Sequence, residues 1–361
     1  MMKPQKRLLR SIAVLAALVA CAAVAFGFAQ TGISHAQSST AKNITDYRIP
    51  SGSMPWGITF DSAGNVWVAA PGCDLTPRCS AGVAPGKLDA FSSSQNKWVK
   101  SVSLPGNYGQ PLFVAVDRSG LVWFSMPMTN TIGAYNPARN SFKQWSLPTS
   151  SSGPWGIAVD KTGNVWVAEH YSYRVASFNP STQRFKEYAT SSTNSQPYGI
   201  TVDGSNNVWF TENVDAVAKI GEVSAKGKLL EYKIRNSNTA GTGLTPHLIT
   251  VDPSGNIWWS EGWVSSIGTL KVSAAKPGTN RGVTEYSYSG NGNSHTSGIS
   301  AGKDGRIWLD DALQNTVGYF SGRSFSFVHA PGNHPHDGLN VDANNHVWFT
   351  EEFSNKLGRT N

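Results

Sequence analysis

A histidine and a glutamate, His247 and Glu261, flank a short turn between two apolar runs of the sequence. If the two runs pair as an antiparallel hairpin, the imidazole lies beside the carboxylate at one end of that hairpin. A histidine oriented by a carboxylate is a common proton-transfer group in enzymes. The spacing therefore makes His247 a candidate catalytic base oriented by Glu261, with a hydrogen-bonded surface histidine as the simpler alternative.

Carboxylates recur at one equivalent place along the chain, three residues after a repeated tryptophan. They are Glu169, Glu212, Glu261, Asp311 and Glu351. We expect each to lie opposite the residue that follows a repeated proline, or its equivalent, with Asp337 joining them from the last hairpin. Converging carboxylates raise one another's pKa unless a cation offsets their charge, and oxygen ligands suit Mg²⁺ or Ca²⁺. The predicted metal ligands are Glu261, Asp311, Glu351 and Glu352. The alternative is that such residues cap backbone amides or pair with lysine and arginine of a neighbouring repeat.

The other half of the same end is predicted to be aromatic. Trp56, Trp155 and Tyr198 stand at the position that His247 takes in its own repeat. Such rings stack on sugars or pack against apolar ligands. The predicted ligand-binding residues are Trp56, Trp155, Tyr198, His334 and Asp337. Histidine is also concentrated here, at His170, His295, His334 and His336. Spacing alone leaves open whether these histidines bind metal, transfer protons or only meet solvent.

These positions belong to a repeat that occurs seven times. Each copy opens with a Pro-x-Gly-Ile-like segment, as in 154–157, passes a turn such as 160–164 and reaches a tryptophan. The tryptophans are Trp67, Trp123, Trp166, Trp209, Trp258, Trp308 and Trp348. Asp, Gly and Asn in the turns favour hairpins, and two further short strands follow in each copy. The pattern predicts an all-β, seven-bladed β-propeller with four antiparallel strands per blade and tryptophans packed between blades.

The two ends of the repeat region complement each other. Residues 43–50 look like a fourth strand without a repeat of its own, and the chain ends at Asn361, after the third strand of the seventh repeat. Pairing these segments closes the ring and hides both sheet edges. We therefore expect residues 37–361 to form one domain in which the N-terminal strand completes the last blade.

Residues 1–36 have the order of a secretory signal peptide. Four basic residues precede an apolar run over 11–28, and Ser34-His35-Ala36 is a small-residue cleavage pattern. We expect a secreted or extracytoplasmic protein, with an uncleaved N-terminal membrane anchor as the alternative. A lipobox at 18–21 is disfavoured, because the residues after Cys21 stay apolar.

Composition excludes one class of partner. Residues 1–36 hold four of the 30 basic residues and none of the 23 acidic ones, so their removal lowers the formal charge from +7 to +3. No basic cluster alternates with aromatic residues in the remainder, which argues against nucleic-acid binding. Cys73 and Cys79 are the cysteines of residues 37–361. An even pair in an oxidising compartment predicts a disulfide, in the loop of blade one, over a zinc site that would need more ligands.

The spellings Pro-x-Gly-Ile, Asn-Val-Trp-Phe-Thr-Glu and Asn-Lys-Leu-Gly-Arg, spread over residues 43–361, resemble the streptogramin B (virginiamycin B) lyase family of seven-bladed propellers. The resemblance implies Mg²⁺-dependent opening of a cyclic depsipeptide lactone by elimination, which is carbon–oxygen lyase chemistry, with a histidine base. The family carries its histidines in Pro-His motifs on the last two blades. Here Ser297 takes the first position. On the last blade, counting back from the turn places Asp337 at the family's histidine position, with His336 one residue earlier. If the register slips, His334-Pro335-His336 matches the family's motif instead. The family's metal glutamate corresponds to Glu351 or Glu352, and its other metal ligand would fall on His334.

We therefore predict a lyase-like propeller with His336 or His247 as base and Mg²⁺, or alternatively Ca²⁺, as cofactor. One alternative is a non-catalytic extracellular propeller that binds a glycan, peptide or envelope component over the aromatic half. Another is a calcium-dependent lactone hydrolase similar to the gluconolactonase-like propellers. In each case the expected partner is a small molecule, peptide or glycan at the mouth of a monomer, with membrane contact only through an N-terminal anchor.

Overall fold

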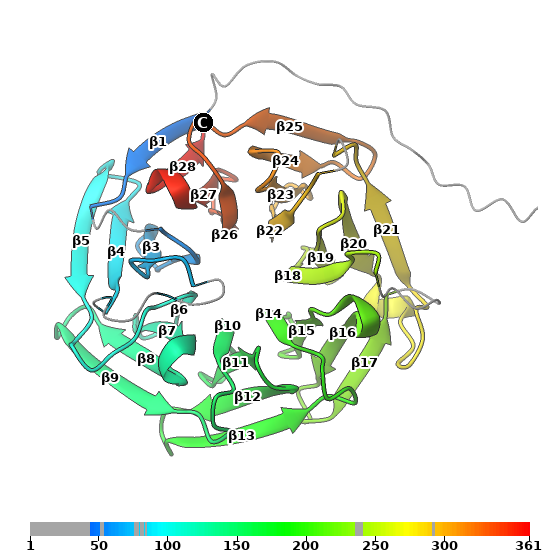
Figure 1. Ribbon diagram of the computed structural model, residues 1–361, viewed down its shortest axis with the longest axis horizontal. Helices are drawn as coiled ribbons and strands as arrows, with labels where there is room; N and C mark the ends of the chain where they lie inside the picture. The colour runs from blue at the N-terminus through cyan, green and yellow to red at the C-terminus, as the bar shows by residue number, and fades with distance from the viewer. Residues whose placement is uncertain are drawn as a thin grey trace, which may run out of the picture. The chain divides into compact units, whose positions relative to one another are not determined.

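Seven four-stranded antiparallel sheets surround a central axis in the part of the chain that the structure describes (Figure 1). The structure is a computed structural model that describes residues 44–50, 54–75, 79, 83, 85–234, 241–290 and 293–361. The expected signal peptide or anchor over 1–36 lies outside these residues. Within them, no helix is long and apolar enough to cross a membrane.

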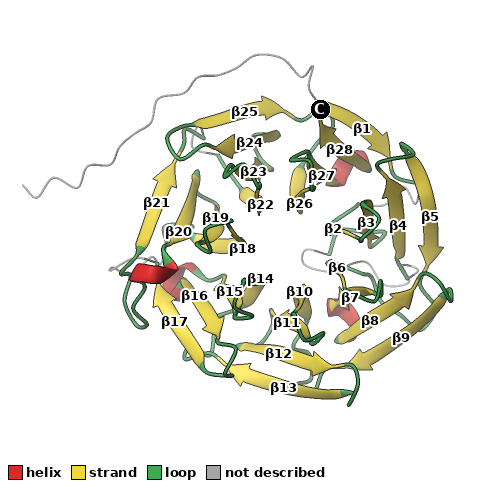
Figure 2. Cartoon of the chain, turned by 180° about the vertical axis from the view of Figure 1, so that it is seen from behind, coloured by secondary structure: helices red, strands yellow, loops and turns green. Residues whose placement is uncertain are grey.

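Each blade runs from an inner strand at the axis to an outer strand at the circumference (Figure 2). The inner strands are β2 (Ile58–Phe60), β6 (Val114–Val116), β10 (Pro154–Val159), β14 (Pro197–Val202), β18 (Thr245–Val251), β22 (Thr296–Ala301) and β26 (Pro335–Val341). The second strands are β3 (Asn65–Ala70), β7 (Val122–Met126), β11 (Val165–Glu169), β15 (Val208–Glu212), β19 (Ile257–Gly262), β23 (Ile307–Asp311) and β27 (Val347–Glu351). Blades one to seven are numbered in this order.

The remaining strands complete the blades. The third strands are β4 (Lys87–Ser92), β8 (Thr131–Asn136), β12 (Arg174–Asn179), β16 (Lys219–Val223), β20 (Ser266–Leu270), β24 (Thr316–Phe320) and β28 (Lys356–Thr360). The outer strands are β5 (Lys97–Ser103), β9 (Ser141–Ser146), β13 (Arg184–Ala189), β17 (Leu229–Lys233), β21 (Val283–Ser287), β25 (Phe325–His329) and β1 (Ile44–Arg48). Single turns of 3-10 helix follow some strands: η2 (Pro127–Thr129), η3 (Asp215–Val217), η4 (Val272–Ala274) and η5 (Glu352–Ser354).

The N-terminal strand closes the ring, as predicted. β1 pairs antiparallel with β28, with Tyr47 opposite Leu357, and so becomes the outer strand of blade seven. Lys356 Nζ lies 2.8 Å from Asp46 Oδ2 across the two strands. The predicted disulfide is also present, since Cys73 and Cys79 are bonded with 5.5 Å between their Cα atoms.

Repeated tryptophans fill the space between blades. Trp123 of blade two packs with Phe178 of blade three, and Trp209 of blade four packs with Ile249 of blade five. The turn before each tryptophan fixes its indole, because an aspartate Oδ2 accepts the Nε1 proton in six of the seven hairpins. In blade six Gly302 takes the aspartate position, and the buried Nε1 of Trp308 has no hydrogen-bond partner among the described residues.

We expect Asp203→Ala to lower the free energy of unfolding by about 2–4 kcal/mol. Asp203 accepts hydrogen bonds from the amides of Ser205 and Asn207 and from the indole of Trp209, so its loss leaves a buried donor unpaired. Urea unfolding followed by tryptophan fluorescence measures the change. Asp304→Ala, in the exposed turn of blade six, is the control and should cost less than about 0.5 kcal/mol. Equal losses in the two variants would contradict the role given to the aspartate.

Candidate functional site

An irregular register at the start of the inner strands decides what faces the axis. Pro154 is paired with Glu169, and the next pair is Ile157 with Val167, so two residues bulge between them. Blades four, five and six show the same shift. The expected pairing of the residue after proline with the carboxylate is therefore wrong, since the proline or its equivalent takes that place. We call the face at which the inner strands begin the mouth.

Blade seven has one residue more in this bulge than the other blades. Pro335 pairs with Glu351, and the next pair is Leu339 with Phe349. His336 therefore follows its proline as His247 follows Pro246, and Asp337, in the left-handed region with φ of 58°, is the additional residue. The assignment of Asp337 to the histidine position was wrong for this reason, and the alternative register His334-Pro335-His336 is the one that forms.

The repeated carboxylates point into the blades. Glu261 accepts hydrogen bonds from Trp259 Nε1 at 3.0 Å and from the Ser266 hydroxyl. Asp311 accepts from the amide of His295 at 3.0 Å and from the Tyr288 hydroxyl at 2.8 Å. Within the described residues these two carboxylates accept hydrogen bonds from their own blade or from the segment that leads into it. The expected acidic half of the mouth is not formed.

The remaining carboxylates of the set have similar surroundings. Glu351 accepts from the amide of Gly332 at 2.8 Å, Glu169 accepts from Ser172, and Glu212 lies 3.8 Å from Lys219 Nζ. Burial, followed by the charge of a neighbouring carboxylate, raises the pKa of Glu169 and of Glu351 to about 7 and that of Glu212 to about 8. Such groups carry protons near neutral pH and are poor metal ligands in that state.

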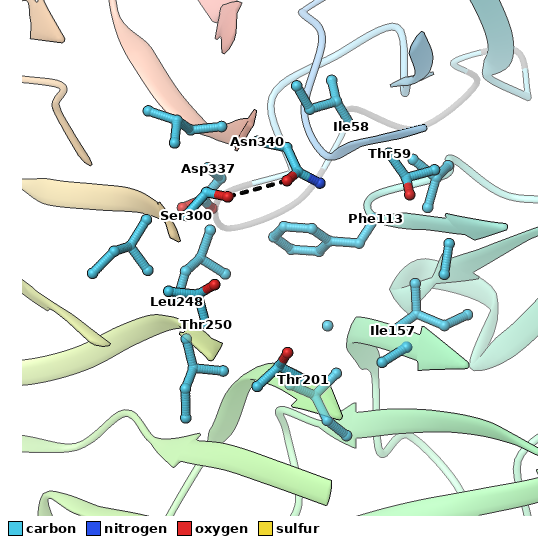
Figure 3. A pocket seen from close by; sticks show the side chains of 18 of the residues that line it. Ile58, Thr59, Phe113, Ile157, Thr201, Leu248, Thr250, Ser300, Asp337 and Asn340 are labelled. Carbon is cyan, nitrogen blue, oxygen red and sulfur yellow. Dashed lines mark hydrogen bonds between the residues drawn. The ribbon is translucent and has the colours of Figure 1, made fainter. Parts of the chain in front are cut away.

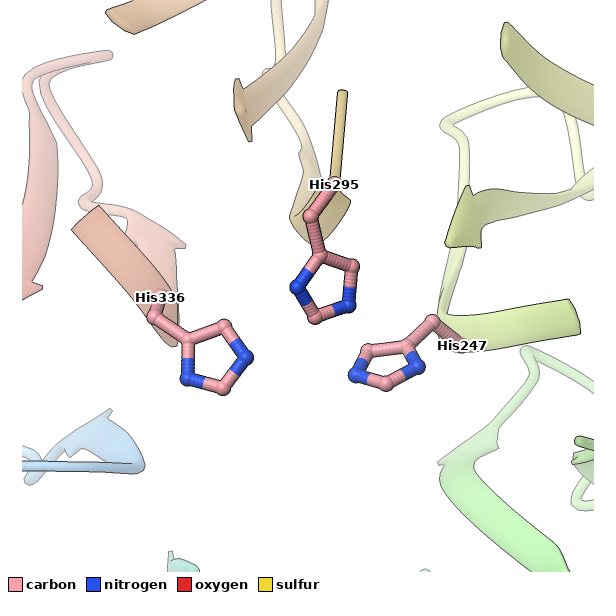
Figure 4. A group of neighbouring side chains, drawn as sticks. All are labelled: His247, His295 and His336. Atoms are coloured by element: carbon pink, nitrogen blue, oxygen red, sulfur yellow. The ribbon is translucent and has the colours of Figure 1, made fainter. Parts of the chain in front are cut away.

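Three imidazoles meet at the centre of the mouth (Figure 4). His247, His295 and His336 come from blades five, six and seven, and each is at least 93% buried. Their rings face one common point, with centroids 5.0 Å apart for His247 and His295 and 5.1 Å apart for His295 and His336. Burial and the charges of the other two histidines hold the pKa of His295 well below its usual range.

A buried carboxylate, Asp337, lies under these imidazoles. Its Oδ1 is 3.2 Å from His247 Nε2 and 3.9 Å from His336 Nε2. Tyr198 and Ser297 donate their hydroxyl protons to it, each at 2.5 Å. Burial alone would raise the pKa of Asp337, but the nearby histidines and hydroxyl donors hold it far below the usual range. The carboxylate is therefore ionised.

A second group surrounds Glu352 at the side of the mouth. Its Oε2 lies 3.4 Å from His336 Nδ1 and 3.5 Å from His334 Nε2. Burial would lower the pKa of His336, but Asp337 and Glu352 raise it to about 9. For His334, burial and the charge of His336 lower the pKa to about 4. Phe353 stacks on the ring of His334 with centroids 4.2 Å apart.

The predicted aromatic residues form a wall rather than an open platform. Trp155 and Tyr198 are in contact at 4.8 Å between ring centroids, and Trp56 lies 6.0 Å from Trp155. His170 packs against Trp155 at 4.4 Å. The three predicted aromatic rings are no more than 3% exposed, so their faces are covered by protein. They shape the site from below and from one side.

Sequence reasoning missed a ring of exposed apolar side chains around the mouth. It comprises Met128, Tyr171, Trp263, Leu313 and Phe353. Each stands two residues after the repeat position that carries the carboxylate, or Met126 in blade two. Trp263 stacks on His295 with centroids 4.4 Å apart, and Tyr171 contacts Trp155. The repeat itself carries the signal, because all five apolar residues share one position, two residues after the carboxylate or Met126. We call these five side chains the rim.

A channel lined by the inner strands runs along the axis (Figure 3). Its cavity measures about 340 Å³ and is lined by the inner strands, with Phe113 and Ile157 among the apolar walls. Ser300 and Asn340 are hydrogen-bonded at 3.1 Å within it, and Asp337 also lies against it. Asp337 therefore lies where the mouth meets the channel.

Comparison with known proteins points to one family. The model of the virginiamycin B lyase family matches residues 92–270. The solved virginiamycin B lyase from Staphylococcus aureus is 23% identical, over 88% of this chain and 98% of that one, with a TM-score of 0.73. A streptogramin B lyase structure is 25% identical, over 90% and 99%, with a TM-score of 0.74. A catalytically inactive variant of the S. aureus enzyme with quinupristin has a TM-score of 0.72 at 23% identity, over 88% and 98%. No curated protein matches the chain by sequence.

We expect Glu212→Gln to flatten the pH dependence of stability. The pKa of Glu212 is about 8 in the fold against an ordinary value of 4.5, so the folded protein binds this proton more tightly. That contribution is complete below pH 4.5 and is lost as the pH rises towards 8. The melting temperature should fall less between pH 5 and pH 8 in the variant than in the wild type. Asp304→Asn, at an exposed site, should leave the profile unchanged, and parallel profiles for wild type and Glu212→Gln would contradict the assignment.

Proposed function

Since this chain is a streptogramin B lyase-like seven-bladed propeller, we propose that it binds an apolar cyclic ester at the mouth and opens it by elimination, as a carbon–oxygen lyase. The observation that carries the proposal is the rim of exposed apolar side chains around buried imidazoles and carboxylates. Exposed apolar surface next to a few fixed polar groups is typical of a ligand site.

The reaction needs a base beside the ligand. It removes the proton on the carbon next to a carbonyl group, the electron pair forms a carbon–carbon double bond, and the carbon–oxygen bond to the leaving carboxylate breaks. His336 has carboxylates near both ring nitrogens, and His247 has Asp337 near Nε2 and the Asn213 amide 3.0 Å from Nδ1. Each of these two imidazoles therefore has polar neighbours close to both ring nitrogens.

His334 is better placed as the base. Its side chain is 18% exposed, against 8% for His336 and for His247, and it adjoins Phe353 of the rim. Glu352 faces its Nε2, which orients the ring and leaves Nδ1 to accept the proton. His336 and His247 are less exposed, and they place polar ring atoms near the oxygen on which negative charge develops.

The Mg²⁺ that the family implies does not fit this donor set, and no step uses it. Mg²⁺ requires oxygen ligands in near-octahedral geometry. Glu261, Asp311 and Glu351 are engaged inside their blades, and the clusters at the mouth contain imidazoles with one carboxylate, Glu352. The same carboxylates would have to hold Ca²⁺, so the calcium-dependent hydrolase has no supporting contact among the described residues.

We expect the purified protein to convert quinupristin, a type B streptogramin, to a product of unchanged mass. Liquid chromatography with mass spectrometry distinguishes this from hydrolysis, which adds one water. His334→Gln should lower kcat by about 10²–10⁴-fold, as for loss of a general base. His329→Gln, on the outer strand β25, is the control and should keep full activity. A product heavier by water would replace elimination with hydrolysis, and binding without turnover would make the protein a binding module.

Removal of the rim should weaken ligand binding. We expect Trp263→Ala and Phe353→Ala each to raise Kd by about tenfold, because each ring covers apolar ligand surface. Calorimetric titration with quinupristin measures the change. Val99→Ala removes another exposed apolar side chain, on the outer strand β5, and should leave Kd unchanged. A loss of affinity in Val99→Ala as large as in the rim variants would argue against binding at the mouth.

We further propose that the protein acts outside the cytoplasm as a monomer. The Cys73–Cys79 disulfide and the apolar segment over 11–28 support the location.

A further inference from the structure

We propose that His247, His295 and His336 form a binding site for one Zn²⁺-class transition-metal ion at the centre of the mouth. The three imidazoles each offer a nitrogen, and these nitrogens lie within 4.8 Å of one another. The site differs in place and chemistry from the oxygen-ligand Mg²⁺ site that the family implies. Binding of the ion does not depend on the ring opening proposed above.

The distances are close to those that a metal needs. Zn–N bonds of 2.0–2.1 Å in tetrahedral geometry place ligand nitrogens about 3.4 Å apart. Side-chain rotations that bring each nitrogen inward by less than about 1 Å would close the site. The rings already face a common point (Figure 4), and they come from the ends of inner strands in three adjacent blades, which hold their backbones rigidly.

Unpartnered nitrogens support the assignment. Nε2 of His295 is buried and has no hydrogen-bond partner among the described residues, and the same holds for Nε2 of His247. His247 Nε2 lies 3.2 Å from Asp337 Oδ1 without the geometry of a hydrogen bond. Leaving buried polar atoms unsatisfied is unfavourable. A coordinated ion would satisfy both nitrogens at once.

The surroundings match those of metal-binding histidines, which usually contact a carboxylate through their second nitrogen. His336 Nδ1 faces Glu352 Oε2 at 3.4 Å, which leaves Nε2 for the ion. The ionised Asp337 lies on the channel side and offsets the charge of a divalent cation. Trp263 stacks on His295 and fixes the plane of its ring.

The donor type selects the ion. Neutral imidazoles suit Zn²⁺, Co²⁺, Ni²⁺ and Cu²⁺, whereas Mg²⁺ and Ca²⁺ prefer oxygen. Three histidines leave a fourth position that faces the rim, as in open zinc sites. A ligand carbonyl oxygen could take that position.

The test is metal binding by the full chain without any substrate. Chelator-treated protein is dialysed against Zn²⁺ or Co²⁺ in the presence of excess Mg²⁺, and bound metal is measured by elemental analysis and by Co²⁺ visible absorption. We expect about one ion per chain and the intense absorption of a four-coordinate Co²⁺ site. His295→Ala should weaken Zn²⁺ binding more than about a hundredfold, and Glu352→Gln by about 10–100-fold. His329→Ala, which leaves the mouth intact, should bind as the wild type does.

The proposal is overturned if the protein retains neither Zn²⁺ nor Co²⁺, or if Mg²⁺ displaces either ion. It is also overturned if His295→Ala binds fully while His334→Ala does not, because that result moves the site to the Glu352 group. His295→Gln, which keeps a polar side chain of similar size, is measured beside His295→Ala, and an unchanged Co²⁺ spectrum in a folded His295 variant would overturn the assignment. A metal-loaded protein that does not open quinupristin supports this inference and removes only the proposed function.

Discussion

A single ionised carboxylate, buried where the channel meets the mouth, ties four blades together. Asp337 belongs to blade seven, but its hydrogen bonds come from Tyr198 in blade four and Ser297 in blade six, and His247 of blade five lies against it. A charge in this position is tolerable only while these groups surround it, because an unpaired buried charge costs several kcal/mol. The arrangement of the inner strands and the raised pKa of His336 both depend on that condition.

The repeat made the fold predictable. Predicted residue pairs were wrong only where the backbone departs from regular strand pairing. Seven hairpins, their tryptophans, the closing strand and the disulfide all follow from local patterns. The bulge near the start of the inner strands of blades three to seven does not, because one extra residue leaves the sequence pattern intact. It shifts the pairing of the residue before it, while the residues after it keep the expected register. For this reason the prediction placed Glu261 and Glu351 at the mouth, whereas their pairing with Pro246 and Pro335 directs them into the blades.

The types of the residues predicted the site better than the pairing partners expected for them. His247, His295 and His336 were all singled out in the sequence, but their convergence depends on which of three adjacent residues in blade seven faces the axis. The rim was overlooked because an exposed apolar residue in a single loop is ordinary. Only the arrangement of five such loops around one opening gives it meaning. The fold of the streptogramin B lyase-like propellers is thus combined here with nitrogen-rich chemistry at the mouth.

The closure of the ring by β1 and β28 also sets an order of events during synthesis. The strand that completes blade seven is made before any of the blades, and its partner β28 is the last strand of the ring to be made. Until β28 emerges, β1 presents an unpaired edge to whatever surrounds the growing chain. Loss of β28 therefore affects more than the C-terminal segment. It leaves β1 without a partner and the ring open, with two unpaired strand edges that can pair with other chains.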